Sequence, residues 1–202
     1  MNLDQFVKLS IAEDVKDGDH STLSCITENK IGSAELLIKE SGIISGIEIA
    51  QSIFKTFDEN IIFNSILKDG QKVEIGDIAF IVSGPSKSLL TIERLVLNVM
   101  QRMSAVSTLT EKFVRKLDGL NTKILDTRKT TPLNRFLEKK AVKIGGGFNH
   151  RFGLYDMIRL KDNHIDFAGG IKNAIEKSNQ YIKTKGLETV SYTHLRAHET
   201  GS

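Results

Sequence analysis

Between residues 124 and 165 the sequence carries three clusters of basic side chains, with a run of glycines among them. An arginine presents a planar fork that matches a carboxylate or phosphate, and a lysine presents a compact positive charge. Glycine has no Cβ, so its backbone can approach a ligand closely. Together these features predict a pocket for a small ligand with several negative charges. The segments are Thr127-Arg128-Lys129, Gly145-Gly146-Gly147, His150-Arg151 and Lys161-Asp162-Asn163-His164.

The formal charge of the 202-residue chain, +3 in total, is unevenly distributed. Residues 121–165 contain ten Lys or Arg and four Asp or Glu, a balance of +6, so the other residues, with 18 and 21, carry −3. Such a block can be a nucleic-acid-binding face, an anion pocket or a solvated surface. Its cations alternate with glycines and apolar residues, and its aromatic residues form no recognisable nucleic-acid motif. An anion pocket is therefore favoured.

Taken singly, each cluster also has an ordinary structural explanation. Lys139, Lys140 and Lys143 lie on one predicted helix, and we expect them to form a solvated face. The triple glycine fits a flexible loop, and His164 fits a structural histidine equally well. Metal ligation is not expected, since neither His150 nor His164 has a Cys or His partner at ligand spacing.

Hydrophobic spacing and turn residues predict the elements that position these clusters. The expected elements up to residue 117 are a helix over 3–15, a polar break over 16–24, a strand pair within 32–46, a helix over 46–57, strands over 61–67, 72–74 and 78–83, and a helix over 86–117 that is weakened at 104–107. A strand (123–126), a helix (133–144), a strand (157–160) and a helix (167–183) follow. This alternation indicates βαβ units, with ligands bound at the carboxyl ends of parallel strands.

The fold class predicted is α/β, in two domains. Residues 1–105 form an N-terminal α+β sandwich domain that includes the inter-domain helix, and residues 106–190 form a parallel α/β-barrel domain. A full (β/α)₈ barrel needs roughly 200–250 residues, so the barrel is expected to be incomplete. Residues 191–202, SYTHLRAHETGS, have no core pattern and are predicted to be a non-native tail.

Composition predicts a globular cytoplasmic protein. The chain is 40% hydrophobic and 26% charged, which is not the composition of a disordered or fibrous protein. Its single cysteine, Cys25, cannot form an internal disulfide, which favours a reducing compartment. The sequence shows neither a secretory signal nor the roughly 18 uninterrupted apolar residues of a membrane-spanning helix.

The motifs resemble, in order and spacing, those of the quinolinate phosphoribosyltransferase family. TRKTTP (127–132), GGGFNHRFGLYDM (145–157) and KDNHI (161–165) carry the resemblance. An early Glu13-Asp14 element with Gly18-Asp19 and the segment ERLVLNVMQRMS (93–104) agree with it. The similarity covers residues 3 to about 190.

The resemblance implies a type II phosphoribosyltransferase-like fold and a pentosyltransferase reaction. Quinolinate and phosphoribosyl pyrophosphate would give nicotinate mononucleotide, pyrophosphate and CO₂ in NAD biosynthesis, with Mg²⁺ on the pyrophosphate. Lys129 would be the catalytic lysine, and Arg94 would enter the active site of the partner subunit in a homodimer. The residues expected to bind substrate are Arg94, Thr127, Arg128, His150, Arg151 and Lys161.

The sequence departs from the family pattern in two places. Leu133-Asn134 stands where the family often has Gly-Leu, a change we expect to be tolerated at the start of a helix. The family's acidic strand residues and its glycine-rich phosphate loops belong at or after Val190. We therefore expect the chain as written to carry the quinolinate half of the site and to be inactive by itself.

Two other functions compete with this one. A paralogue associated with molybdenum transport has a similar fold, but the intact TRKTTP, NHR and KDNHI clusters argue against it. A lipoyl- or biotin-like carrier is suggested by DGQKVEIGD (69–77), although no modifiable lysine at an exposed hairpin tip is evident.

Overall fold

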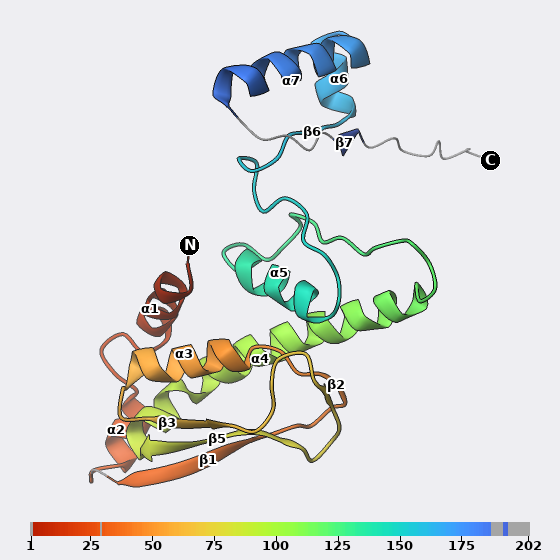
Figure 1. Ribbon diagram of the computed structural model, residues 1–202. Helices are drawn as coiled ribbons and strands as arrows, with labels where there is room; N and C mark the ends of the chain where they lie inside the picture. Colours follow the sequence, from red (N-terminus) through yellow and green to blue (C-terminus); the bar gives the residue numbers. More distant parts are fainter. Residues whose placement is uncertain (1, 29, 187–191, 194–202) are drawn as a thin grey trace, which may run out of the picture. The chain divides into compact units, whose positions relative to one another are not determined.

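The computed structural model describes residues 2–28, 30–186 and 192–193. Packing divides the chain into two compact units, residues 1–150 and residues 151–202, and each is described by itself. The first unit contains α1 (Leu3–Asp14), α2 (His20–Cys25), β1 (Ile31–Leu37), β2 (Gly42–Ile43), α3 (Ile47–Phe57), β3 (Ile62–Ser65), β4 (Lys72–Val73), β5 (Ile78–Pro85), α4 (Ser86–Lys116) and α5 (Arg135–Ile144) (Figure 1). The second unit contains β6 (Arg159–Leu160), α6 (Asp162–Ala168), α7 (Ile171–Lys185) and β7 (Tyr192–Thr193).

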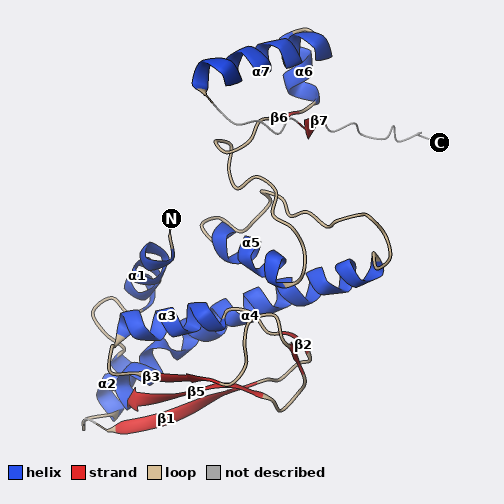
Figure 2. Cartoon of the chain, viewed as in Figure 1, coloured by secondary structure: helices blue, strands red, loops and turns tan. Residues whose placement is uncertain are grey.

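One layer of the first unit is a three-stranded antiparallel sheet with the order β1-β5-β3 (Figure 2). The predicted strands over 61–67 and 78–83 are thus confirmed as β3 and β5. The Phe80 ring on the central strand lies 4.5 Å from the ring of Phe63 on β3 and 6.2 Å from the ring of Phe54 on α3, measured between centroids. This aromatic cluster joins the sheet to the helical layer.

The long helix α4 contributes the largest part of the core. Its buried residues recur every three or four positions, which forms one apolar stripe. Each large apolar side chain buried in this way contributes about 1.5–3 kcal/mol. Figure 1 shows the sheet below α4 and α5 above it, and α4 also packs against α3. The apolar residues of the stripe are Leu89, Ile92, Val96, Val99, Met100 and Met103.

The weakening of this helix predicted at 104–107 is wrong, because α4 continues unbroken to Lys116. The two serines there serve tertiary contacts. Ser104 Oγ accepts a hydrogen bond from the Ser45 backbone N–H at 3.0 Å. Ser107 Oγ donates to the Ala141 carbonyl of α5 at 2.8 Å. Small polar residues therefore let the β2 segment and α5 pack closely against the helix.

The polar break predicted over 16–24 contains a short helix, α2. Asp19 begins it as the N-cap, since its carboxylate accepts a hydrogen bond from the Thr22 backbone N–H at 3.0 Å. Capping carboxylates of this kind satisfy the free N–H groups of a first helical turn. The aspartate that interrupts the hydrophobic pattern is thus also the residue that starts the helix.

The parallel α/β part is less regular than the alternation predicted. The strand expected over 123–126 is a single parallel bridge between Leu125 and Phe148. The strand expected over 157–160 is β6, which pairs in parallel with β7. The helix expected over 167–183 is two helices, because Gly169 and Gly170, at φ +86° and +114°, end α6 and begin α7.

The predicted domain boundary near residue 105 lies within α4. The predicted tail, residues 191–202, lies outside the described residues apart from the two positions of β7. Among the described residues, no helix combines the length and the apolar character needed to cross a membrane.

Candidate functional site

Two of the predicted basic segments run side by side in the first unit. Besides the bridge between Leu125 and Phe148, the Asp126 N–H donates to the Phe148 carbonyl at 3.0 Å, and the Phe148 N–H donates to the Ile124 carbonyl at 2.9 Å. The chain then continues from Asp126 into Thr127–Lys129 and from Phe148 towards His150. Backbone pairing therefore brings residues more than twenty positions apart to one edge.

Asp126 organises this edge. Its Oδ1 accepts a hydrogen bond from the His150 backbone N–H at 2.8 Å, and its Oδ2 accepts from Asn149 Nδ2 at 2.6 Å. The Lys139 ammonium forms an ion pair with the same carboxylate and donates to the His150 carbonyl at 3.0 Å. The expectation that Lys139 lies on a solvated face is wrong, since its side chain is 4% exposed.

The Thr127–Lys129 segment bends at Arg128, and its residues are unequally buried. Thr127 and Lys129 are exposed, and Thr127 Oγ1 accepts a hydrogen bond from the Lys129 backbone N–H at 3.1 Å. Arg128 is half-buried, and its buried Nε has no hydrogen-bond partner among the described residues. A buried donor without an acceptor is costly, by about 1–3 kcal/mol or more when charged, so this nitrogen is suited to an anionic ligand.

Glu138 anchors the loop that follows. Its carboxylate accepts hydrogen bonds from the Thr131 hydroxyl at 2.8 Å, from the Thr131 N–H at 3.2 Å, and from Arg102 Nη2 of α4 at 2.7 Å. Burial by itself raises the pKa of Glu138, but the hydrogen bonds from Arg102 and Thr131 outweigh it and hold the pKa below its ordinary value. Sequence reasoning missed Glu138 because nothing local marks it as buried.

The triple glycine has a packing role. A Cβ on Gly145 would lie 2.4 Å from the Ser107 carbonyl oxygen and 2.8 Å from Thr110 Cβ, and one on Gly147 would lie 2.8 Å from Val142 Cγ1. These glycines permit the end of α5 and the following segment to approach α4. The sequence suggested that these glycines let the backbone approach a ligand. In the structure, Gly145 and Gly147 let it approach other parts of the first unit.

Arg151 and Lys161 belong to the second unit. Arg151 is 9% exposed, and its Nη1 donates to the Met157 carbonyl at 3.2 Å. Lys161 is exposed at the start of α6, where its backbone N–H donates to His164 Nδ1 at 3.1 Å. Of the two explanations for His164, this contact favours the structural one.

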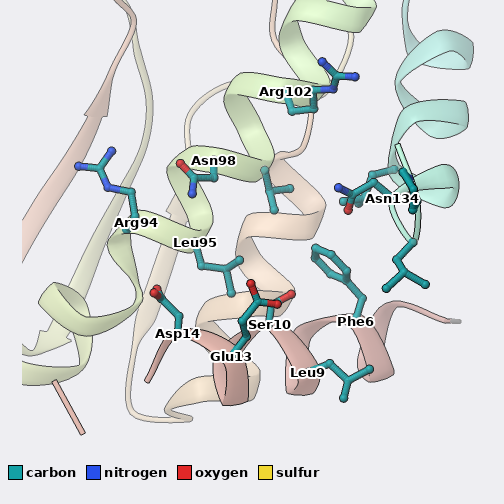
Figure 3. Close-up of a pocket in the computed structure, with 14 residues that line it drawn as sticks. Phe6, Leu9, Ser10, Glu13, Asp14, Arg94, Leu95, Asn98, Arg102 and Asn134 are labelled. Carbon is teal, nitrogen blue, oxygen red and sulfur yellow. The ribbon is translucent and has the colours of Figure 1, made fainter. Parts of the chain in front are cut away.

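Arg94 is exposed on α4 and lines a cavity of about 430 Å³. Figure 3 shows Arg94 and Asn98 projecting from α4, and Ser10 and Glu13 projecting from α1. The cavity extends to the Pro132–Asn134 segment. Its lining does not include Thr127–Lys129 or His150, so Arg94 belongs to a different part of the first unit's surface.

The pattern that suggested a carrier domain serves the fold. Asp69 Oδ1 accepts hydrogen bonds from the backbone N–H groups of Gly46 and Ile47, at 2.7 and 2.8 Å, where α3 begins. Gly46 has φ +105°, a conformation that glycine adopts readily. Lys72 lies within β4, which is paired with β2. The Asp69 segment therefore caps α3.

Two family models match the chain. Residues 19–104 match the N-terminal domain of quinolinate phosphoribosyl transferase, and residues 106–198 match its C-terminal domain. Among curated proteins, the probable nicotinate-nucleotide pyrophosphorylase [carboxylating] of Bacillus subtilis is 46% identical over 170 residues, which cover 83% of this chain and 58% of that protein. The chloroplastic enzyme of that name from Arabidopsis thaliana is 42% identical over 188 residues, 93% of this chain and 53% of that protein.

Solved structures agree with these matches. The crystal structure of NadC from Streptococcus pyogenes superposes with a TM-score of 0.84 at 39% identity, over 89% of this chain and 65% of that one. A NadC deletion mutant superposes with a TM-score of 0.90 at 36% identity, over 96% of this chain and 68% of that one. The chain spans a little over half the length of the curated relatives above. It belongs to the quinolinate phosphoribosyltransferase family.

Proposed function

We propose that this chain forms the quinolinate-binding part of an enzyme that transfers the phosphoribosyl group of phosphoribosyl pyrophosphate to quinolinate, with decarboxylation to nicotinate mononucleotide, CO₂ and pyrophosphate. The transfer itself requires the acidic residues and phosphate loops that the family resemblance places at or after Val190. The observation that carries the proposal is the buried, unpartnered Nε of Arg128 beside the Asp126–His150 edge. A substrate carboxylate would supply the acceptor that this donor lacks. Because the chain belongs to this family, quinolinate is proposed as the dicarboxylate and phosphoribosyl pyrophosphate as the sugar donor.

The charges of the two substrates explain why the site is basic. Quinolinate has two carboxylates and the sugar donor has several phosphate charges, so the two repel each other in water. Arg128, His150, Arg151 and Lys161 are proposed to bind quinolinate, and Thr127 to contribute to the same site. Cations fixed before the substrates arrive offset the repulsion and hold the pyridine nitrogen against the anomeric carbon. Lys129 is proposed as the catalytic lysine at that junction.

Mg²⁺ is proposed to accompany the donor. Among the described residues, no cluster of three or more His, Cys, Asp or Glu side chains forms a metal site. Pyrophosphate oxygens are the hard ligands that Mg²⁺ prefers, so the donor itself can carry the ion. When bound, the ion neutralises charge on the departing pyrophosphate.

A homodimer in which Arg94 reaches the partner's site is also part of the proposal. It is supported by the position of Arg94, whose cavity does not include the Thr127–Lys129 segment. A cytoplasmic location is proposed as well, supported by the presence of a single cysteine, Cys25, which is exposed and free.

Calorimetric titration with quinolinate and with nicotinate tests the substrate assignment. Nicotinate lacks one of the two carboxylates, so quinolinate is expected to bind at least about tenfold more tightly, a difference of about 1.4 kcal/mol. Formation of nicotinate mononucleotide from quinolinate, phosphoribosyl pyrophosphate and Mg²⁺, by an enzyme that includes those acidic residues and loops, tests the transfer itself. Equal affinity for the two acids, or a product that keeps both carboxylates, contradicts the proposal.

A further inference from the structure

Lys139 and Asp126 form an ion pair in the interior of the first unit. Their side chains are 4% and 5% exposed. Lys139 is one of the buried residues of α5, as Leu137 and Ala141 are. It lies two positions from each of them, about 200° around the helix, and therefore on a different face. Taking two charges out of water has a large desolvation cost that a leucine or methionine avoids. Packing alone therefore does not explain the pair.

The pair joins two segments that are proposed to bind substrate. Asp126 accepts from the His150 N–H at 2.8 Å, and Lys139 donates to the His150 carbonyl at 3.0 Å, so both backbone polar groups of His150 are held. Asn149 Nδ2 donates to Asp126 Oδ2 at 2.6 Å and to the Lys139 carbonyl at 2.8 Å. Asp126 directly precedes the Thr127–Lys129 segment.

We propose that Lys139 is a positioning residue, which through Asp126 fixes the Thr127–Lys129 segment against His150 before quinolinate binds. This rests on the proposed function, because the two segments are its quinolinate site. An ion pair with directed hydrogen bonds selects one arrangement of the two segments, whereas apolar contacts allow several. Cations already in place need no reorganisation when the substrate arrives.

Three variants of the full chain test the role. Lys139→Met removes the charge and keeps the length of the side chain. The double variant Lys139→Met/Asp126→Asn removes both charges, so it leaves no buried charge without a partner. Lys140→Met is the matched control. Lys140 is the next residue on α5, and it pairs at 2.6 Å with Glu48 in a partly exposed ion pair.

Two measurements are made on each folded variant: the dissociation constant for quinolinate, and the hydrogen-exchange rate of the His150 amide. Misplacement of binding groups by about 1 Å can cost on the order of 10²-fold. Lys139→Met and the double variant are therefore expected to bind quinolinate on the order of 10²-fold more weakly and to exchange the His150 amide faster. Lys140→Met is expected to change neither quantity by more than about twofold.

Unchanged affinity and unchanged exchange in Lys139→Met overturn the proposal. If that variant does not fold, the double variant decides. If the double variant is as stable as the unsubstituted chain but binds quinolinate weakly, the positioning role is supported. If it regains both the stability and the quinolinate affinity of the unsubstituted chain, the proposal is overturned. If the unsubstituted chain does not bind quinolinate, the proposed function fails, and the exchange rate of the His150 amide alone decides whether Lys139 fixes this edge.

Discussion

Arg102 of α4 donates two hydrogen bonds to a single carboxylate oxygen of Glu138 on α5, from Nε at 3.0 Å and from Nη2 at 2.7 Å. The Glu138 side chain is 9% exposed and the Arg102 side chain 57%. Because Glu138 also holds Thr131, this contact connects α4 to the loop that follows Lys129. The position of the proposed catalytic segment thus depends on a carboxylate that must stay ionised.

Glu138→Gln is expected to make stability less sensitive to acid. The pKa of Glu138 is lower in the folded protein than its ordinary value. The ionised carboxylate therefore contributes its full stabilisation at pH values above the ordinary pKa, and this stabilisation is lost as the pH falls through the lower, folded-state pKa. At about pH 7 the variant is expected to be about 1 kcal/mol less stable, because charge-assisted hydrogen bonds become neutral ones. Urea unfolding at about pH 7 and about pH 3.5 measures whether this gap closes in acid.

Glu111→Gln is the control for that experiment. Glu111 pairs with Arg115 one turn later on α4 at 3.4 Å, and the side chains are 34% and 65% exposed. An exposed pair of this kind contributes about 0–1 kcal/mol, so the difference from the unsubstituted protein is expected to be small at both pH values. If the difference in free energy of unfolding between Glu138→Gln and the unsubstituted protein is as large in acid as at neutral pH, the ionised carboxylate is not what stabilises the loop.

Leu133→Gly is expected to keep or raise stability, by up to about 1 kcal/mol. Leu133 has φ +65°, a left-handed conformation that costs a leucine about 1–2 kcal/mol, and its side chain is 75% exposed. Glycine relieves that strain but makes the unfolded chain more flexible. Free energies of unfolding from urea titrations measure the balance.

The matched control is Leu109→Gly on α4. Leu109 is also exposed, at 56%, but lies in a regular helix, so glycine there is expected to cost about 1 kcal/mol. Equal losses for the two variants would mean that the backbone at Leu133 is unstrained. The expectation that leucine is tolerated at this helix start did not anticipate this backbone conformation.

Local patterns were enough to predict most of the first unit. Helices α3 and α4 and strands β3 and β5 each have a periodic apolar face or a run bounded by turns, and all four lie close to their predicted positions. The one interruption predicted in α4 was wrong because Ser104 and Ser107 bond to Ser45 and Ala141, which are distant in sequence. Nothing in the helix itself reveals those partners.

The burial of Lys139 is the corresponding error at the site. A lysine on a helix with two neighbouring lysines is usually solvated, and its partner Asp126 lies thirteen positions earlier. A buried cation requires an anion within reach. The one sequence feature that could have indicated a buried Lys139 is Asp126, at the end of a predicted strand. The basic loops, by contrast, can be picked out by residue type alone, and their role in binding substrate stays a prediction.

In an enzyme that includes the acidic residues and phosphate loops expected at or after Val190, Lys129→Ala is expected to lower turnover by at least about 10²-fold while leaving most of the quinolinate affinity. The Lys129 side chain is exposed, so its loss should change the free energy of unfolding by less than about 0.5 kcal/mol. Steady-state rates and calorimetric dissociation constants separate the two effects. Lys143→Ala, an exposed lysine on α5, controls for the loss of one positive charge. Quinolinate binding lost in parallel with turnover would count against a catalytic role.

Mixing two inactive variants of the enzyme that includes the acidic residues and phosphate loops tests whether Arg94 acts across a dimer. In a heterodimer of Arg94→Ala and Lys129→Ala, one site has both substitutions and the other has neither. Random exchange makes half of all dimers heterodimers, so about a quarter of full activity is expected to return. A mixture of Arg128→Ala and Lys129→Ala should stay inactive, because both substitutions lie on one segment and no intact site can form. If the first mixture also stays inactive while native mass spectrometry shows exchanged subunits, Arg94 acts within its own chain.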